Sequence, residues 1–348
     1  MIKINSQTIV KKICAAVIIV LVALIPLLME NNIVFKQNKY YYVLLCLIGI
    51  YAIATSGLDI LFGYTGQISF GHAGFFCIGA YGSVLLSHKD WGISMLGLPT
   101  LPPILSIIVA GLLAAGIGAI LAVPASKLVF HFLALLTIAF NQIMLLFVAN
   151  FPQLTNGYIG ITGIPAVQIF SLNFTTRKSK FMYFYLVLFF LAILLILKQN
   201  LIHSRVGRGL IAIRENPMAA NGCGVNLHKY KIMSFGISAF YVGVAGGLYA
   251  HMIGFISPDT FVQNTSVIFI TMLLFGGSGN LFGPIFGAMV ITFIQEGFQA
   301  LSNYRMLIYG IVLLLLILYQ PTGIAGFGKD ISRRVKKIGG GSNGNARS

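Results

Sequence analysis

A polar, glycine-rich stretch separates two strongly apolar segments between Gly63 and Phe76, where the sequence is GYTGQISFGHAGFF. Non-helical backbone at membrane depth is tolerated only where protein buries it or where it lines a watery cavity. In such a cavity, five side chains could donate and accept hydrogen bonds to a zwitterionic solute: Tyr64, Thr65, Gln67, Ser69 and His72. The same groups could instead satisfy freed backbone atoms while the glycines let helices pack closely. His72 alone fits this second interpretation better, as a histidine satisfied at a helix start.

A second copy of this pattern occurs later in the chain. Residues 61–71 (LFGYTGQISFG) match residues 274–283 (LFGGSGNLFG), with Ser69 left unmatched. Each copy separates two apolar segments, and paired glycine-interrupted helices in corresponding positions indicate the pathway of a transporter built from repeats. Ser278 and Asn280 therefore join the candidate pathway residues. A match this short in a glycine-rich chain can also arise by chance.

A basic loop at 201–230 carries a different signal. In RVGRGLIAIRE, residues 205–215, Val206, Leu210 and Ile213 fall on one face at helical spacing, which predicts a short amphipathic helix. Asn216 is a favoured N-cap and Pro217 a favoured first helical residue, so a second short helix should follow and end at Gly222 or Gly224. Two short helices at an angle form a projecting elbow. The alternative is a basic loop held to anionic headgroups.

The elements that would position these residues are apolar helices. Of the 348 residues, 57% are hydrophobic and 9% charged, too few polar groups to cover a soluble surface. A spanning helix needs roughly 20 apolar residues. The fold class is therefore an all-α polytopic integral membrane protein with about ten spans, some short or broken. The spans are predicted at 13–29, 40–62, 72–87, 103–123, 129–149, 181–199, 231–256, 265–275, 283–299 and 305–320.

The distribution of lysine and arginine predicts the orientation. Most of the 23 basic residues fall on one side when both termini are placed in the cytoplasm. Residues 1–328 then form one transmembrane domain, and residues 329–348 form a basic, glycine-rich disordered tail. The net charge of +16 thus indicates topology and contact with membrane lipid. Without an aromatic and basic platform, no nucleic-acid partner is expected.

Signatures of catalysis or of nucleotide binding are missing from the sequence. It contains no GxxxxGK[ST], HExxH or GxSxG pattern, and its four cysteines form no metal-ligand pairs. We therefore expect no enzyme, no catalytic residue, no metal and no cofactor. The acidic residues fall in loops or near span ends, Asp59 among them, which argues against a proton-coupled carrier. A carrier that holds sodium at broken helices stays open.

The elbow and the glycine-rich segments together resemble a known family. Met218, Ala219 and Ala220, followed after three residues by Gly224, are similar to the EAA-x3-G loop of permease subunits in bacterial ABC importers, with methionine in place of glutamate. Three segments in this order, 57–81, 207–231 and 275–288, resemble the LivM-type permeases of branched-chain amino acid importers. The resemblance runs from about residue 42 to residue 320 and implies a type II-like ABC importer permease fold.

The resemblance implies a function, partners and coupling residues. The chain would translocate leucine, isoleucine or valine by alternating access across the bacterial inner membrane. Its partners would be a second, LivH-like permease, two cytoplasmic ABC ATPase subunits, and a periplasmic or lipid-anchored substrate-binding protein that docks near residues 156–165. The loop would contact the ATPase through the following residues: Arg208, Arg214, Glu215, Asn216, Pro217, Met218, Ala219, Ala220 and Gly224.

Several alternatives remain at this point. Relatives of the same family carry urea, short amides or other amino acids, and Asp59 stands where the family motif is expected to have a neutral residue such as asparagine. A self-sufficient secondary carrier or channel is a second class of function. An intramembrane enzyme is a third, for which no nucleophile, metal set or carboxylate pair is visible.

Overall fold

Helices account for most of the chain that the structure describes. The computed structural model describes residues 39–88, 92, 99–128, 130–169, 172–173, 180–297, 310 and 314. The predicted span 13–29, the predicted tail 329–348 and all but two positions of the predicted span 305–320 lie outside these residues.

The eight other predicted spans each correspond to one helix. Five of them are long and apolar enough to cross a membrane: α2 (Lys39–Thr65), α4 (Pro103–Ala125), α5 (Phe130–Asn150), α7 (Lys180–His203) and α10 (Leu227–Ile253). The other three are shorter apolar helices: α3 (His72–Ser87), α11 (Gln263–Gly276) and α12 (Gly283–Gly297). The chain is thus an all-α, multi-pass membrane protein.

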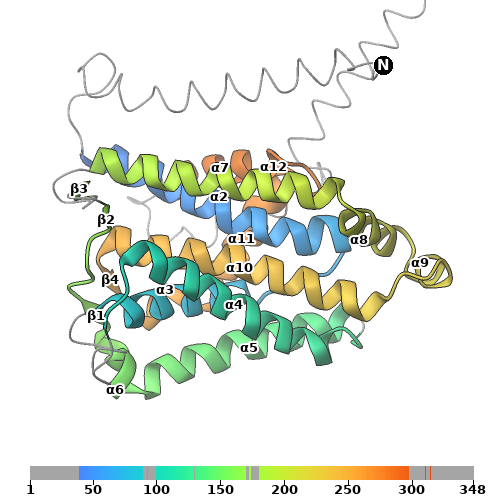
Figure 1. The fold of residues 1–348 in the computed structure, drawn as a ribbon, viewed down its shortest axis with the longest axis horizontal. Coiled ribbons are helices and arrows are strands. Elements are labelled where there is room, and N and C mark those ends of the chain that lie inside the picture. Colours follow the sequence, from blue (N-terminus) through green and yellow to red (C-terminus); the bar gives the residue numbers. More distant parts are fainter. Residues whose placement is uncertain are drawn as a thin grey trace, which may run out of the picture.

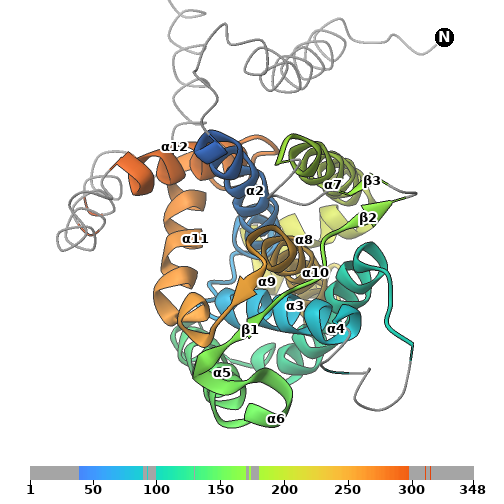
Figure 2. The same cartoon turned by 90° about the vertical axis from the view of Figure 1, so that its left-hand side faces the viewer.

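Two long helices form the centre of the bundle. α2 and α10 are mostly buried, whereas the larger part of α4, α5 and α7 faces outward. In Figure 2, which looks along the helices, α10 lies in the middle and the other long helices surround it. The outward faces are apolar, as a surface in contact with hydrocarbon must be. Examples are Leu112 and Ile120 on α4, Phe132 and Leu135 on α5, and Phe189 and Ile196 on α7.

Close backbone contact joins α10 to α3. A Cβ atom added at Gly79 would overlap the carbonyl oxygen of Gly243, and one added at Gly246 would overlap that of Phe76. Small residues at such crossings let helix backbones touch, which is how helices pack without a hydrophobic driving force in a bilayer. Glycine is therefore required on both helices of this pair.

The two ends of the bundle differ. One end carries α6 (Pro152–Thr155), the 3-10 turns η2 (Gly157–Ile159) and η3 (Pro258–Phe261), and four short strands. β1 (Ile161–Thr162) pairs antiparallel with β4 (Phe255–Ile256), and β2 (Gln168–Ile169) pairs with β3 (Leu172–Asn173). The opposite end carries α8 (Arg205–Glu215) and α9 (Pro217–Gly222) (Figure 1). The segment 156–165 and the elbow thus lie at opposite ends.

Two glycines of α4 give a matched test of the packing. A Cβ added at Gly118 would lie 2.6 Å from the Cβ of Ala239 on α10, whereas one added at Gly116 meets nothing within 4 Å. We expect Gly118→Val to destabilise the protein by about 1–3 kcal/mol through overpacking. Gly116→Val is the control and should unfold like the wild type. Thermal unfolding in detergent measures both, and equal midpoints for the two variants would contradict the observed contact.

Candidate functional site

The first glycine-rich segment forms a short break between α2 and α3. α2 continues to Thr65, three residues beyond the predicted end of the span, and α3 begins at His72 as predicted. The non-helical part is therefore residues 66–71. Gly66 has φ +71°, a left-handed conformation that glycine adopts without a steric penalty.

Side chains of two distant helices satisfy the backbone of this break. The amide of Phe70 donates to Thr137 Oγ1 of α5 at 3.0 Å, and its carbonyl accepts from Gln263 Nε2 of α11 at 2.9 Å. At the start of α3, the amide of Ala73 donates to Ser266 Oγ of α11 at 2.8 Å. The break is thus buried in protein and held from two sides.

Three of the predicted pathway residues already have partners inside the protein. The two ring nitrogens of His72 lie 3.1 Å from Ser69 Oγ and 2.8 Å from Ser238 Oγ, and the imidazole is fully buried. Thr65 Oγ1 donates to the carbonyl of Leu61. These contacts match the interpretation in which polar atoms stabilise the break. A role of these side chains in a solute pathway stays a prediction.

Two further pathway residues have different surroundings. The side-chain oxygen Oε1 of Gln67 is buried and has no hydrogen-bond partner among the described residues. Tyr64 is also buried, and its ring centroid lies 6.0 Å from Nζ of Lys198. Gln67 thus offers a buried acceptor that no described residue occupies. Its contact with a solute remains a prediction.

The second glycine-rich segment also interrupts two helices. α11 ends at Gly276 and α12 begins at Gly283, so residues 277–282 form a break between two helices. Gly279, which the sequence match pairs with Gly66, has φ +74°. Within this break, Asn280 Nδ2 donates to the carbonyl of Ser278 at 3.5 Å. The positive φ of this matched glycine is shared, but the helix ends differ, since α11 ends at Gly276, the match of Gly63, whereas α2 continues to Thr65, the match of Ser278. The internal repeat stays a prediction.

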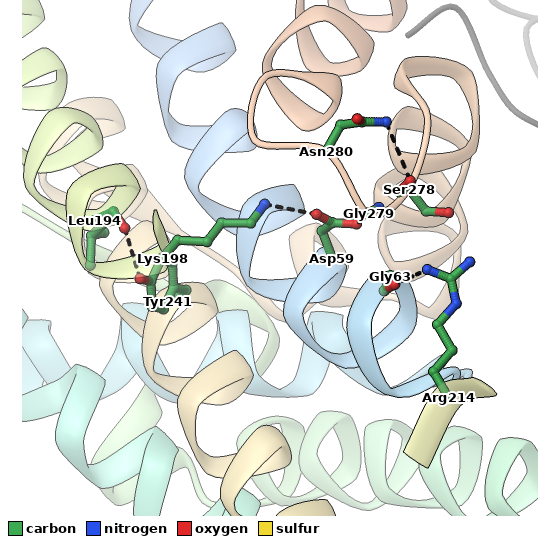
Figure 3. A network of polar contacts seen from close by, with 9 residues as sticks. All are labelled: Asp59, Gly63, Leu194, Lys198, Arg214, Tyr241, Ser278, Gly279 and Asn280. Atoms are coloured by element: carbon green, nitrogen blue, oxygen red, sulfur yellow. Dashed lines mark hydrogen bonds and ion pairs between the residues drawn. The ribbon is translucent and has the colours of Figure 1, made fainter. Parts of the chain in front are cut away.

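Asp59 of α2 connects this second break and α7 to α2. Its carboxylate oxygen Oδ1 accepts from the amide of Gly279 at 2.7 Å, and Oδ2 accepts from Nζ of Lys198 on α7 at 2.8 Å (Figure 3). Both charged side chains are fully buried. The sequence did not predict this pair, because Asp59 falls near a predicted span end and lysines near span ends first indicate orientation. The available signal was one acidic and one basic residue within otherwise apolar segments.

Arg214 of α8 reaches the same turn of α2. Its Nη1 donates to the carbonyl of Gly63, which follows Asp59 by four residues and so lies on the same helix face (Figure 3). Carbonyls in the last turn of a helix lack intrahelical partners, and an arginine is a favourable donor there. We call the five residues that meet here the junction: Asp59, Gly63, Lys198, Arg214 and Gly279.

The elbow beyond Arg214 has the predicted form. α8 covers residues 205–215 and buries Leu210 and Ile213, while α9 starts at Pro217 with the Asn216 side chain accepting from the amide of Ala219 at 3.1 Å. The side chain of Met218 is 87% exposed. α9 lies at the extreme end of the molecule, beyond α8 (Figure 1). The elbow thus ends in a capped, exposed helix, and Arg214 joins it to the last turn of α2.

Metal-binding chemistry finds no support in the described part of the chain. It contains no group of three or more histidine, cysteine or acidic side chains that could hold a metal ion. Cys46 and Cys77 are buried and Cys223 is exposed, and none of these three described cysteines forms a disulfide with another.

Comparison with known proteins identifies the family. The profile of the family described as "Branched-chain amino acid transport system / permease component" matches residues 40–317. The chain belongs to this family. It is 32% identical over 295 residues to the high-affinity branched-chain amino acid transport system permease protein LivM of Escherichia coli K12, covering 79% of this chain and 67% of that relative.

Two other relatives extend this result. The permease is 24% identical over 324 residues to a probable LivM of Methanocaldococcus jannaschii, covering 81% of this chain and 92% of the relative. It is 26% identical over 290 residues to LivH of Escherichia coli K12, covering 79% of this chain and 91% of that relative. No solved structure matches the chain. The predicted resemblance to LivM-type permeases is confirmed, and relatives that are transport permeases support a role that is not enzymatic.

The buried ion pair predicts the stability of two variants. Lys198→Met leaves the Asp59 carboxylate charged and buried without its cation, which should lower the free energy of unfolding by about 3–5 kcal/mol. Combining it with Asp59→Asn removes both charges, so the loss should fall to about 1–3 kcal/mol, the cost of an unsatisfied amide. Thermal unfolding in detergent compares them. A double variant no more stable than Lys198→Met would contradict the pairing.

Proposed function

We propose that this permease is one of two transmembrane subunits of an ATP-driven importer for branched-chain amino acids in the bacterial inner membrane. The main support for this proposal is the elbow formed by α8 and α9. It is a short, capped and exposed element at one end of the bundle, and Arg214 links it to a helix that ends in a glycine break. An element of this kind can transmit the movement of another protein to the membrane helices.

The energy for transport comes from partner subunits. Family membership and the exposed surface of α9 support a contact with two cytoplasmic ABC ATPase subunits. The similarity to LivH supports a second, LivH-like permease as the other transmembrane subunit. A periplasmic or lipid-anchored binding protein docks at the end that carries β1 and β4, opposite the elbow.

The finer architecture follows the same family pattern. We propose a type II-like importer fold with about ten spans and both termini in the cytoplasm, in which residues 1–328 form the permease domain and residues 329–348 a cytoplasmic tail. The elbow then lies on the cytoplasmic side, in agreement with its basic residues. The two glycine breaks lie near the pathway, with Tyr64, Thr65, Gln67, Ser69, His72, Ser278 and Asn280 as candidate contacts of the cargo.

An apolar cavity favours branched-chain amino acids over urea or short amides. It measures about 200 Å³ and lies beside the first break, between α2 and α11. Its hydroxyl-bearing neighbours Ser69 and Thr271 already form hydrogen bonds within the protein. A branched aliphatic side chain suits such walls because its burial is favourable by about 0.8 kcal/mol per CH₂ group. The lining includes Leu58, Phe62, Ile68, Phe70, Val267 and Ile270.

Reconstitution in lipid vesicles tests the proposed function. The permease is combined with its partner permease, the ATPase subunits and the binding protein, and uptake of labelled leucine is measured. We expect uptake only when ATP and the ATPase subunits are both present, with competition by isoleucine and valine but not by urea or acetamide. Leucine uptake by the permease alone under an ion gradient would instead establish a secondary carrier.

A substitution on the elbow tests the contact with the ATPase. Ala219→Arg places a long charged side chain on α9, and Pro217→Leu removes the residue that starts this helix. We expect either change to abolish transport while the protein still inserts in the membrane, because the docking surface is altered and the bundle is not. Ala219→Ser, which adds one oxygen atom, is the matched control. Unchanged transport-coupled ATP hydrolysis in the arginine variant would refute the lever role.

A further inference from the structure

The two oxygen atoms of Asp59 serve two different elements. Oδ2 is bound by Lys198 of α7, and Oδ1 holds the amide of Gly279 in the break between α11 and α12. Neither element is close to Asp59 in sequence, since the two contacts span 139 and 220 residues. One side chain on α2 therefore fixes both α7 and the second glycine break.

Atoms are packed without space at this point. A Cβ atom added at Gly63 would lie 2.6 Å from the amide nitrogen of Gly279 and would overlap Oδ1 of Asp59. A Cβ added at Gly279 would lie 3.2 Å from Nη1 of Arg214, the atom that donates to the Gly63 carbonyl. The guanidinium of Arg214 thus binds the turn of α2 that also contacts Gly279, and the carboxylate of Asp59 binds Gly279 itself.

The charge of Asp59 and its role as an acceptor are separable. An asparagine at this position keeps an oxygen that can accept from Gly279, and it needs no cation. A carboxylate accepts more strongly, but in a buried site it requires a positive partner. Lys198 supplies that partner. The carboxylate therefore needs the lysine, whereas the hydrogen bond to Gly279 is the polar contact of Asp59 with the second break.

We propose that Asp59 is a positioning residue for energy coupling: its Oδ1 keeps the break between α11 and α12 attached to the turn of α2 that Arg214 holds. Movement of α8 then reaches both glycine breaks together. The first break directly follows the end of α2, which Arg214 holds, and the second is bound to α2 by Asp59. This inference rests on the proposed function, in which α8 and α9 respond to the ATPase.

Two double variants separate this role from simple stability. Asp59→Asn with Lys198→Met removes both charges and keeps the acceptor for Gly279. Asp59→Leu with Lys198→Met removes both charges and the acceptor, with a side chain of similar size. The first variant leaves the two N–H donors of the asparagine NH₂ group without their acceptor, and the second leaves the single backbone N–H of Gly279 unpaired. The asparagine variant should therefore be no more stable than the leucine variant, so that a loss of coupling confined to the leucine variant is not explained by lower stability.

The complete transporter in vesicles provides the measurement. The ratio of ATP hydrolysis with binding protein and leucine to hydrolysis without them reports coupling, and leucine uptake per ATP is a second readout. We expect the asparagine variant to keep the wild-type ratio. The leucine variant should lose stimulation on the order of tenfold, within the usual range of coupling between sites.

Each other outcome decides against the inference. If both variants stay coupled, the hydrogen bond to Gly279 does not transmit movement, and if both lose coupling equally, the ion pair itself is what matters. Should the leucine variant fail to assemble, Asp59→Ala with Lys198→Met takes its place, since the smaller side chain cannot clash. These results leave the proposed function intact, which fails only if the wild-type transporter shows no ATP-dependent leucine uptake.

Discussion

Backbone that leaves helical geometry between apolar helices must find its hydrogen bonds within the protein wherever no water-filled cavity reaches it. The described part of this permease has two such breaks in related segments, and both are satisfied by distant side chains. Thr137 and Gln263 pair with the backbone of Phe70, and Asp59 pairs with the amide of Gly279. These requirements decide which helices are neighbours. α5 and α11 must lie beside the first break, and α2 must lie beside the second.

The same constraint explains how the elbow is attached to the bundle. The carbonyl of Gly63 lies in the last turn of α2 and needs a donor, which Arg214 of α8 provides. Leu210 and Ile213 bury the inner face of α8 at the same time. α8 is thus fixed both by apolar packing and by a helix cap from another element, while α9 stays exposed. A force on α9 is applied to α8 as a whole and so to the end of α2.

Local features of the fold were predictable from the sequence, and tertiary pairings were not. The start of α3 at His72 follows from the apolar run after the glycine-rich segment, the extent of α8 follows from apolar spacing, and the start of α9 follows from Asn216 and Pro217. All of these signals act within a few residues. The match between the two glycine segments predicted similar geometry, but it could not show that the segments touch. The pairing of Asp59 with Lys198 depends on how α2 packs against α7, over 139 residues of sequence. The span count stays a prediction, since three of the helices are shorter than a spanning helix.

A buried ion pair is a poor means of stabilising a bundle, because desolvation of both charges offsets their attraction and apolar side chains of similar volume do as well. At the junction, the ion pair matters because separating its two charges is costly. Moving α7 away from α2 would leave Lys198 and Asp59 buried and unpaired, which costs far more than separating two apolar side chains. Moving the second break away would leave the Gly279 amide without a partner. States in which these elements separate are therefore penalised, which favours movements in which α2, α7 and the break between α11 and α12 keep these contacts.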